Sequence, residues 1–509
     1  MEYKLSHAVW EITYACNMNC MHCGSSCGEK YPDELTNEEA LALCDDLVGL
    51  GLKQITLSGG EPFMRPDWSD LAKRFSTQGV AANVISNGWF ITEELIDKAF
   101  ESGLRNIGMS VDGLKETHDT IRKSGSFDRL MKAMDLCKER KMPVAVNTCI
   151  NNRNLGELAG MRDMLNQKGV LKWQFQIARP MGNFLKHQDL VLEPSRVDEL
   201  LDFAYETTQQ GRIQIHLGDD IGYYSAKQDA INSAISGGKP VGQWTGCHAG
   251  KRVIGVRANG DIIGCLSIRD NRYIEGNVRK IPLKELWTRP GAFAWNRDLT
   301  KKDLKGFCSS CQHGAVCLGG CAGVKLTMTG SMEENKYCHY RNSIIKQSRD
   351  IESLDNYDDL MRYGETSVSQ KSYQMADLYF QRALELKPQD ARAIDFLGFV
   401  NFFLENYEIS KGYNEKALEL NPANAYAHKG LGLCLSRLGK LQEGILEITK
   451  AIEMSGDNNL DYYMDLVAVL DENRRTKEAF KILKQVRKTS PDFKKKSEGV
   501  YNFLVKKLG

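Results

Sequence analysis

The chain has 509 residues, of which 42% are hydrophobic and 26% are charged, which is the composition of a globular protein of about three domains. Its net charge of +1 gives no indication of a nucleic-acid partner. No run of about 18 apolar residues predicts a membrane span, and the first residues contain no apolar segment of signal-peptide length, so we expect a cytoplasmic protein.

The first half of the chain alternates apolar strands with amphipathic helices. A strand is predicted at residues 8–14 and a helix at 36–50, which begins with the capping box of Thr36 and Glu39. The stretch 53–63 predicts a strand that ends in a glycine turn. Later strands are predicted at 82–86, 106–111, 144–150 and 172–178, and later helices at 92–102, 126–140, 154–168 and 195–209. This alternation predicts an α/β fold, a partial TIM-like barrel of six β/α units in residues 1–230.

Unusual sequences follow five of these strands. They are four cysteines after the first strand, then SGGEP, SNG, SVDG and CINN after the next four. In barrel-like folds the chemistry lies at the carboxyl ends of the strands. The coincidence therefore predicts an active site at that end of the sheet.

The cysteines of the first loop have the spacing C-x3-C-x2-C, at Cys16, Cys20 and Cys23. Disulfides are not expected in the cytoplasm. A structural zinc site would need a fourth ligand, which Cys27 or His22 would supply. Alternatively, three thiolates hold three irons of a [4Fe–4S] cluster and leave the fourth iron for a ligand that is not protein. Because a zinc site would not account for GGEP, SNG and SVDG, we favour the cluster.

This loop, with an aromatic residue before its last cysteine and with GGEP at residues 59–62, resembles the radical S-adenosylmethionine (SAM) enzymes. The resemblance implies that SAM binds the open iron and that its cleavage gives a 5′-deoxyadenosyl radical, which abstracts a hydrogen atom. Cys27 is then not expected to be a ligand. The resemblance assigns SAM binding to His22, Gly59, Gly60, Glu61, Ser86, Asn87, Ser110 and Arg122.

A second group of seven cysteines resembles the SPASM domain, here in residues 240–350. The resemblance implies two auxiliary [4Fe–4S] clusters. The first would bind Cys247, Cys265 and Cys321, and the second Cys308, Cys311, Cys317 and Cys338. The first lacks a fourth thiolate, so either His248, an acidic side chain or water caps its iron, or the site is open to substrate, which we favour. A zinc ribbon would explain only part of this spacing.

The last part of the chain, residues 355–509, contains a repeat. The segment ALELKPQDARA at Ala383 recurs at Ala417 and Ala451, at intervals of 34 residues. This period resembles tetratricopeptide repeats and predicts an all-α solenoid of about four copies. Such arrays offer a concave groove for a peptide or protein, although a packing or dimerisation module is the alternative.

These features together predict a radical SAM enzyme that modifies a ribosomally made peptide or a protein by crosslinking, epimerisation or oxidation. The repeats would dock the substrate or a partner, and flavodoxin or ferredoxin would supply electrons. The alternatives are a radical SAM dehydrogenase or oxidase of a small molecule in cofactor or antibiotic biosynthesis, and a scaffold with structural clusters. A sulfatase maturase is disfavoured because Leu266 stands where that branch has an aspartate. Cys149 is a candidate hydrogen donor, or else a small packing residue.

Overall fold

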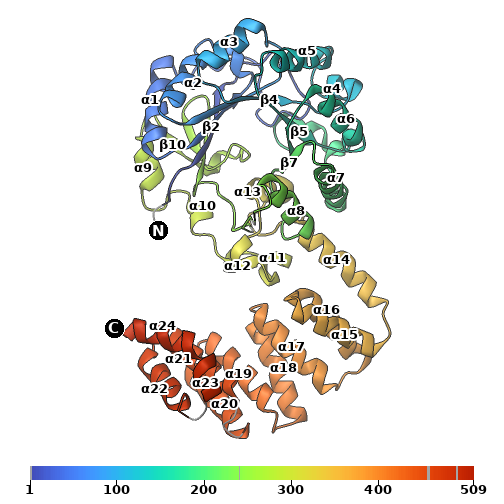
Figure 1. Ribbon diagram of the computed structural model, residues 1–509, viewed down its shortest axis with the longest axis vertical. Helices are drawn as coiled ribbons and strands as arrows, with labels where there is room; N and C mark the ends of the chain where they lie inside the picture. Colours follow the sequence, from blue (N-terminus) through green and yellow to red (C-terminus); the bar gives the residue numbers. More distant parts are fainter. Residues whose placement is uncertain (1–2, 240, 243, 456–458, 489–490, 509) are drawn as a thin grey trace. The chain divides into compact units, whose positions relative to one another are not determined.

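The structure is a computed structural model that describes residues 3–239, 241–242, 244–455, 459–488 and 491–508 (Figure 1). The chain forms two compact units. The first contains Met1–Ser309 and His313–Ser343, and the second contains Ser310–Gln312 and Ile344–Gly509. Among the described residues, no helix has both the length and the apolar character needed to cross a membrane.

A single ten-stranded sheet organises the first unit, in the order β10-β9-β8-β1-β2-β3-β4-β5-β6-β7. The six predicted strands are β1 (His7–Thr13), β2 (Gln54–Gly59), β3 (Ala81–Ser86), β4 (Asn106–Ser110), β5 (Val144–Ile150) and β6 (Lys172–Ile177). They pair in parallel with their neighbours in the sequence. The predicted partial barrel is thus confirmed.

Four further strands extend this sheet beyond the predicted set. β7 (Gln214–Leu217) pairs in parallel with β6. At the other side β8 (Val253–Val256) pairs in parallel with β1, and β9 (Asp261–Ile263) and β10 (Ile274–Asn277) continue in antiparallel fashion. The second cysteine region therefore shares backbone hydrogen bonds with the first strand of the barrel.

Helices line the outer side of the sheet in Figure 1. They are α1 (Asn37–Gly49), α2 (Trp68–Thr77), α3 (Glu93–Glu101), α4 (Lys115–Ile121), α5 (Ser126–Glu139), α6 (Leu158–Lys168) and α7 (Val197–Gln209). The capping box of Thr36 and Glu39 is present at α1, whereas α2 and α4 were not predicted. Large side chains such as Trp10, Phe75 and Trp173 are fully buried between the layers, so the loops at the strand ends rest on a packed core.

Short helices make up most of the region that carries the second group of cysteines. They are α8 (Ala226–Ile235), α9 (Leu283–Thr288), α10 (Ala294–Arg297), α11 (Gly306–Ser310), α12 (Gly314–Cys317), α13 (Ala322–Thr329) and α14 (His339–Glu352). Apart from α14, none exceeds ten residues. Helices this short have little stability of their own, so tertiary contacts must hold this region together.

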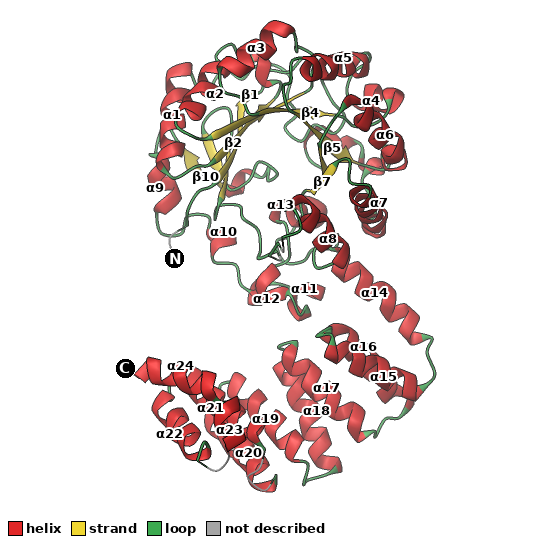
Figure 2. Ribbon diagram, in the orientation of Figure 1, coloured by secondary structure: helices red, strands yellow, loops and turns green. Residues whose placement is uncertain are grey.

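Helices joined by loops make up the described residues of the second unit, and Figure 2 shows no strand among them. Its helices are α15 (Tyr357–Ser369), α16 (Tyr373–Leu386), α17 (Ala391–Phe403), α18 (Tyr407–Leu420), α19 (Ala425–Arg437), α20 (Leu441–Met454), α21 (Leu460–Glu472), α22 (Thr476–Val486), α23 (Pro491–Lys496) and α24 (Glu498–Leu508). The helices α16, α18 and α20 begin at residues 373, 407 and 441, which reproduces the predicted interval of 34. The helical repeat is thus confirmed.

Two of the glycines that recur at this interval lie at close contacts between helices. A Cβ atom at Gly364 would come within 2.4 Å of the Phe380 ring, and one at Gly432 would come within 2.6 Å of the Gly444 carbonyl oxygen. At these two positions the repeat therefore needs a residue without a side chain where two helices meet.

Replacing Gly432 by alanine should destabilise the repeat unit, because the added methyl group forces α19 away from α20. We expect a loss of about 1–3 kcal/mol, typical of overpacking. Gly412, on the exposed side of α18, has no atom within 4 Å of an added Cβ, so Gly412→Ala should stabilise the unit by about 0.5–1 kcal/mol. Thermal unfolding of the two variants measures both effects, and shifts of the same sign would contradict this account.

Candidate active site

A cavity of about 200 Å³ lies where the strands of the first unit end. Its lining brings together most of the residues predicted to bind the cluster and SAM: Cys16, Cys20, His22, Cys23, Gly59, Gly60, Ser86, Asn87, Ser110 and Arg122. Cys149 also lines it. Loops after β1, β2, β3, β4 and β5 thus converge on one space, because parallel strands present their carboxyl ends at the same edge.

Hydrogen bonds within the loop and from the segment after β6 hold the cysteine loop after β1. The Cys16 N–H donates to the Gly28 carbonyl oxygen at 2.7 Å. Asn183, in the loop after β6, donates its N–H to the Cys23 carbonyl at 2.9 Å and its side-chain amide to the Cys20 carbonyl at 3.1 Å. The contribution of Asn183 was not predicted, since no local pattern marks it. Cys16, Cys20 and Cys23 are all free thiols. Hydrogen bonds, and not a disulfide, therefore hold the loop.

Cys27 is buried beside the three predicted ligands and also lines the cavity. Its N–H donates to Cys23 Sγ at 3.5 Å, and its side chain packs with Tyr14 and Ala258. These contacts give Cys27 a packing role and a hydrogen bond to a predicted ligand sulfur.

The two glycines of GGEP allow a close approach between the ends of β1 and β2. A Cβ atom at Gly59 would come within 2.2 Å of the Thr13 carbonyl oxygen, and one at Gly60 within 2.1 Å of the Ala15 carbonyl oxygen. Gly59 also has φ +131°, which disfavours other residues. The glycines therefore bring the turn against the backbone just before Cys16, besides leaving the cavity wall free of side chains.

Glu61 is fully buried and, unlike its neighbours, is not part of the cavity lining. Its carboxylate accepts hydrogen bonds from Ser86 Oγ at 2.9 Å and from the Asn87 N–H at 2.8 Å. Burial raises its pKa to about 7, against the opposing effect of these hydrogen bonds. Glu61 therefore fixes the turn after β3, which presents Ser86 and Asn87 to the cavity.

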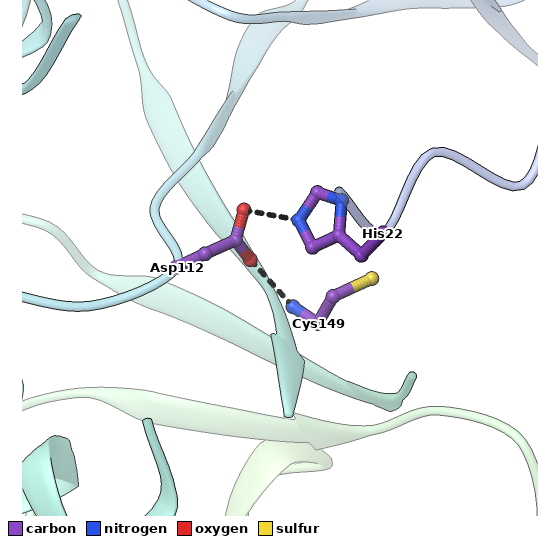
Figure 3. A group of neighbouring side chains, drawn as sticks. All are labelled: His22, Asp112 and Cys149. Atoms are coloured by element: carbon purple, nitrogen blue, oxygen red, sulfur yellow. Dashed lines mark hydrogen bonds and ion pairs between the residues drawn. The ribbon is translucent and has the colours of Figure 1, made fainter. Parts of the chain in front are cut away.

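Asp112, in the SVDG segment after β4, joins three residues of the cavity lining, of which Figure 3 draws His22 and Cys149. Its Oδ2 lies 2.7 Å from His22 Nε2 and accepts from Arg122 Nε at 2.5 Å, and its Oδ1 accepts from the Cys149 N–H at 2.8 Å. Burial alone would raise its pKa, but Arg122 and His22 hold the pKa of Asp112 well below its usual value. The motif was recognised from the sequence, but this role of its aspartate was not.

His22, Asp112 and Cys149 have ligand atoms within 4.8 Å of one another, the arrangement of a possible mononuclear metal site. The guanidinium group of Arg122 already shares Asp112 Oδ2 with His22, however. A bare divalent ion on that oxygen would be repelled by Arg122, unlike an iron–sulfur cluster, whose sulfides and thiolates offset the charge of its irons. We therefore interpret Asp112 as a positioning residue, which directs Arg122 toward Cys20 Sγ at 4.0 Å.

The Cys149 thiol lines the cavity at the end of β5. Burial, together with the nearby Asp112, raises its pKa to about 12. The thiol therefore stays protonated at neutral pH, as a hydrogen donor requires. Its role as a donor stays a prediction.

Six of the seven cysteines of the second group lie in the first unit, where they form two neighbourhoods. Burial raises the pKa of Cys321, and Cys247 is among the neighbours that raise it further. Burial likewise raises the pKa of Cys338, with contributions from Cys317 and Cys308. The remaining predicted ligands are Cys265, which packs in the same apolar cluster as Cys247, and Cys311, which is buried in the segment Ser310–Gln312.

Lys325 lies fully buried near both neighbourhoods. Its ammonium group donates to the Leu318 carbonyl oxygen at 2.8 Å. Burial lowers its pKa, while Cys247, Cys308, Cys317 and Cys321 act in the opposite direction. A buried cation needs anionic partners, and the thiolates of two iron–sulfur clusters are anionic groups of the kind required. The donor set therefore fits the predicted clusters.

Comparison with known proteins agrees with this geometry. Residues 10–165 match the radical SAM superfamily, residues 247–312 the SPASM iron–sulfur cluster-binding domain, and residues 360–390 a tetratricopeptide repeat. The chain is therefore a radical SAM enzyme with a SPASM domain and a tetratricopeptide repeat region. Its cofactors are SAM and [4Fe–4S] clusters.

The relatives differ in the substrates that their names imply. The chain is 29% identical to an AdoMet-dependent heme synthase of Methanosarcina barkeri (strain Fusaro) over 65% of this chain and 95% of the relative. It is 27% identical to a mycofactocin maturase of Mycobacterium tuberculosis (strain H37Rv) over 62% of this chain and 78% of the relative. The relatives therefore leave the class of substrate open.

Solved structures share the fold. Streptococcus suis SuiB bound to S-adenosylmethionine has a TM-score of 0.53 at 15% identity, over 66% of this chain and 78% of that chain. The native anSMEcpe structure with bound AdoMet has a TM-score of 0.53 at 18% identity, over 68% of this chain and 97% of that chain.

Proposed function

We propose that this enzyme abstracts a hydrogen atom from a peptide or protein and so modifies it by crosslinking, epimerisation or oxidation. The cluster and SAM, when bound, supply a 5′-deoxyadenosyl radical for this step. In the proposal Cys16, Cys20 and Cys23 hold the cluster, while the glycines of the turn after β2 and the polar residues after β3 and β4 bind SAM. A flavodoxin or a ferredoxin delivers the electron.

Within this proposal Asp112 keeps two lining groups in fixed positions. It binds Arg122 and His22 through one carboxylate oxygen. Ionised at neutral pH, it balances the positive charge of Arg122 next to the thiolate of Cys20.

The repeat unit is the observation that supports a polypeptide substrate. The alignment with the heme synthase covers 95% of that relative but only 65% of this chain, and the match to a tetratricopeptide repeat lies at residues 360–390. Helical arrays of this type present extended surfaces suited to polypeptides. The mycofactocin maturase, another relative, is named for a maturation reaction.

Coexpression with short open reading frames that neighbour the gene should reveal a peptide whose mass changes. A chain that ends at residue 354 should modify the full-length peptide at least tenfold more slowly than the whole enzyme, but a short core fragment at a similar rate. Mass spectrometry measures both rates. Equal rates on both substrates would remove the docking role.

A hydrogen-donor role of Cys149 can be tested in D2O, where the thiol carries deuterium. Loss of solvent deuterium from the product of the Cys149→Ser variant would support this role, and retention of the deuterium would exclude it.

A tetrapyrrole substrate is the second candidate, because several relatives, including the heme synthase, are named for tetrapyrrole products. Incubation of the reduced enzyme with iron coproporphyrin III and SAM separates the two proposals. Conversion of this compound at a rate comparable with SAM cleavage would favour the tetrapyrrole. Binding and turnover of the peptide alone would favour polypeptide modification.

A further inference from the structure

A buried ion pair lies next to the cysteines assigned to the first auxiliary cluster. Arg179, two residues after β6, and Asp219, two residues after β7, expose only 4% and 8% of their side chains. Arg179 Nη2 lies 3.3 Å from Asp219 Oδ1, and the same oxygen lies 3.9 Å from Cys321 Sγ. The mechanism described above gives this pair no role.

We propose that the carboxylate of Asp219 is the fourth protein ligand of the first auxiliary [4Fe–4S] cluster, beside Cys247, Cys265 and Cys321. The inference rests on the proposed assignment of those three thiols. It replaces the open site favoured by the sequence with a site closed by an oxygen ligand. It does not depend on the identity of the substrate.

The surroundings of Asp219 orient its carboxylate as those of a metal ligand do. The Ile177 N–H donates to Oδ2 at 3.3 Å, and Arg179 holds Oδ1 on the side of Cys321. Carboxylates that bind metals are commonly fixed by such outer hydrogen bonds. Asp219 also has φ +54°, a left-handed conformation that is uncommon outside glycine and concentrates at functional sites.

The donors of Arg179 also point to a missing group at this place. Its Nε and Nη1 atoms are buried and have no hydrogen-bond partner among the described residues. A Cβ atom at Gly323, two residues after Cys321, would come within 2.4 Å of Nη1, so the guanidinium group is packed against the cysteine loop. Buried donors are nearly always satisfied. The sulfur atoms of a cluster accept such hydrogen bonds, and the unpartnered donors therefore support a cluster here.

Two other groups compete for the role of fourth ligand. Asp220 directs Oδ2 to the Cys321 N–H at 3.1 Å and to the side chain of Asn335, so its carboxylate supports the loop backbone. The His248 ring packs against the Trp244 ring, with 5.1 Å between centroids. Asp219, by contrast, places its own carboxylate oxygen 3.9 Å from a predicted ligand sulfur, Cys321 Sγ.

The test uses the full-length chain with Cys16, Cys20 and Cys23 replaced by alanine, purified without oxygen and loaded with 57Fe. Only auxiliary clusters then remain, about eight irons in two clusters. Mössbauer spectra should show about one iron in eight with an oxygen ligand. Asp219→Cys should convert this iron to the all-sulfur type, and Asp219→Asn should let a chelator remove about one iron. Neither measurement uses SAM or substrate, so failure of the peptide proposal would not affect the result.

Asp220→Asn is the matched control, because it alters an adjacent buried carboxylate and should keep the oxygen-bound iron. Circular dichroism and retention of the four irons of the second cluster show whether each variant folds. Spectra unchanged by Asp219→Cys, loss of the oxygen-bound iron in Asp220→Asn, or an all-sulfur spectrum in the parent chain would each overturn the proposal. A parent chain with only about four irons would do so as well.

Discussion

Replacement of Cys16, Cys20 and Cys23 together by alanine should abolish cleavage of SAM by the reduced enzyme. The three thiols lie on one loop and face the same cavity, and no cluster can form there without them. The iron content should fall from about 12 to about eight per chain, because the SPASM cysteines are untouched. Iron analysis together with chromatographic measurement of 5′-deoxyadenosine checks both outcomes.

Cys27→Ala is the matched control, since this thiol is buried beside the same loop. It should keep the iron content near the full value and keep most of the SAM cleavage. If Cys27→Ala instead lost about four irons, the loop would need all four thiols, and the open iron on which the radical chemistry depends would not exist. Zinc bound to this loop in the purified enzyme would equally contradict the assignment of an iron–sulfur cluster.

The second large effect is expected from Asp112→Ala. This change leaves Arg122 and His22 buried without the carboxylate that both contact. Removing one partner of a buried ion pair typically costs about 3–5 kcal/mol. We therefore expect a clear fall in the melting temperature of the first unit and loss of SAM binding, because Arg122 would no longer be held at the cavity. Calorimetry and equilibrium binding of SAM measure the two effects.

Asp112→Asn separates charge from shape, because the amide keeps the size of the side chain but not its charge. The melting temperature and the SAM affinity of Asp112→Asn should lie between those of the wild type and of Asp112→Ala. Asp45, which forms an exposed ion pair with Arg74, supplies the control: exposed pairs contribute little to stability, so Asp45→Ala should leave the melting temperature nearly unchanged. Equal effects of Asp45→Ala and Asp112→Ala would contradict the positioning role of Asp112.

The proposed ligand set also accounts for two buried cationic side chains that lie near cysteines. Lys325 and Arg179 are both buried next to thiols. Cations in such places are costly unless anions balance them, and cluster thiolates are anions. Loading with iron should therefore stabilise the SPASM region, because binding free energy adds to folding free energy.

Much of the fold could be predicted because its signals are local. Strand and helix alternation, the capping box at Thr36 and the interval of 34 residues are properties of short segments, and each appears in the structure. The spacing of Cys16, Cys20 and Cys23 likewise acts within one loop. The helices α2 and α4 and the strands β7 to β10 were not predicted, since short elements gain most of their stability from tertiary packing.

The sequence by itself determined the class of chemistry and the presence of a repeat array, and it predicted the cysteines that would hold iron, because each of these lies within a continuous stretch of chain. The tertiary structure decided which distant groups meet. It joined Asp112 to His22 across 90 positions and brought Asp219 to Cys321 across 102. The physical reason is that a parallel sheet brings the carboxyl ends of its strands to one edge. Residues that are far apart in the sequence become neighbours there, and no local sequence pattern predicts which of them will meet.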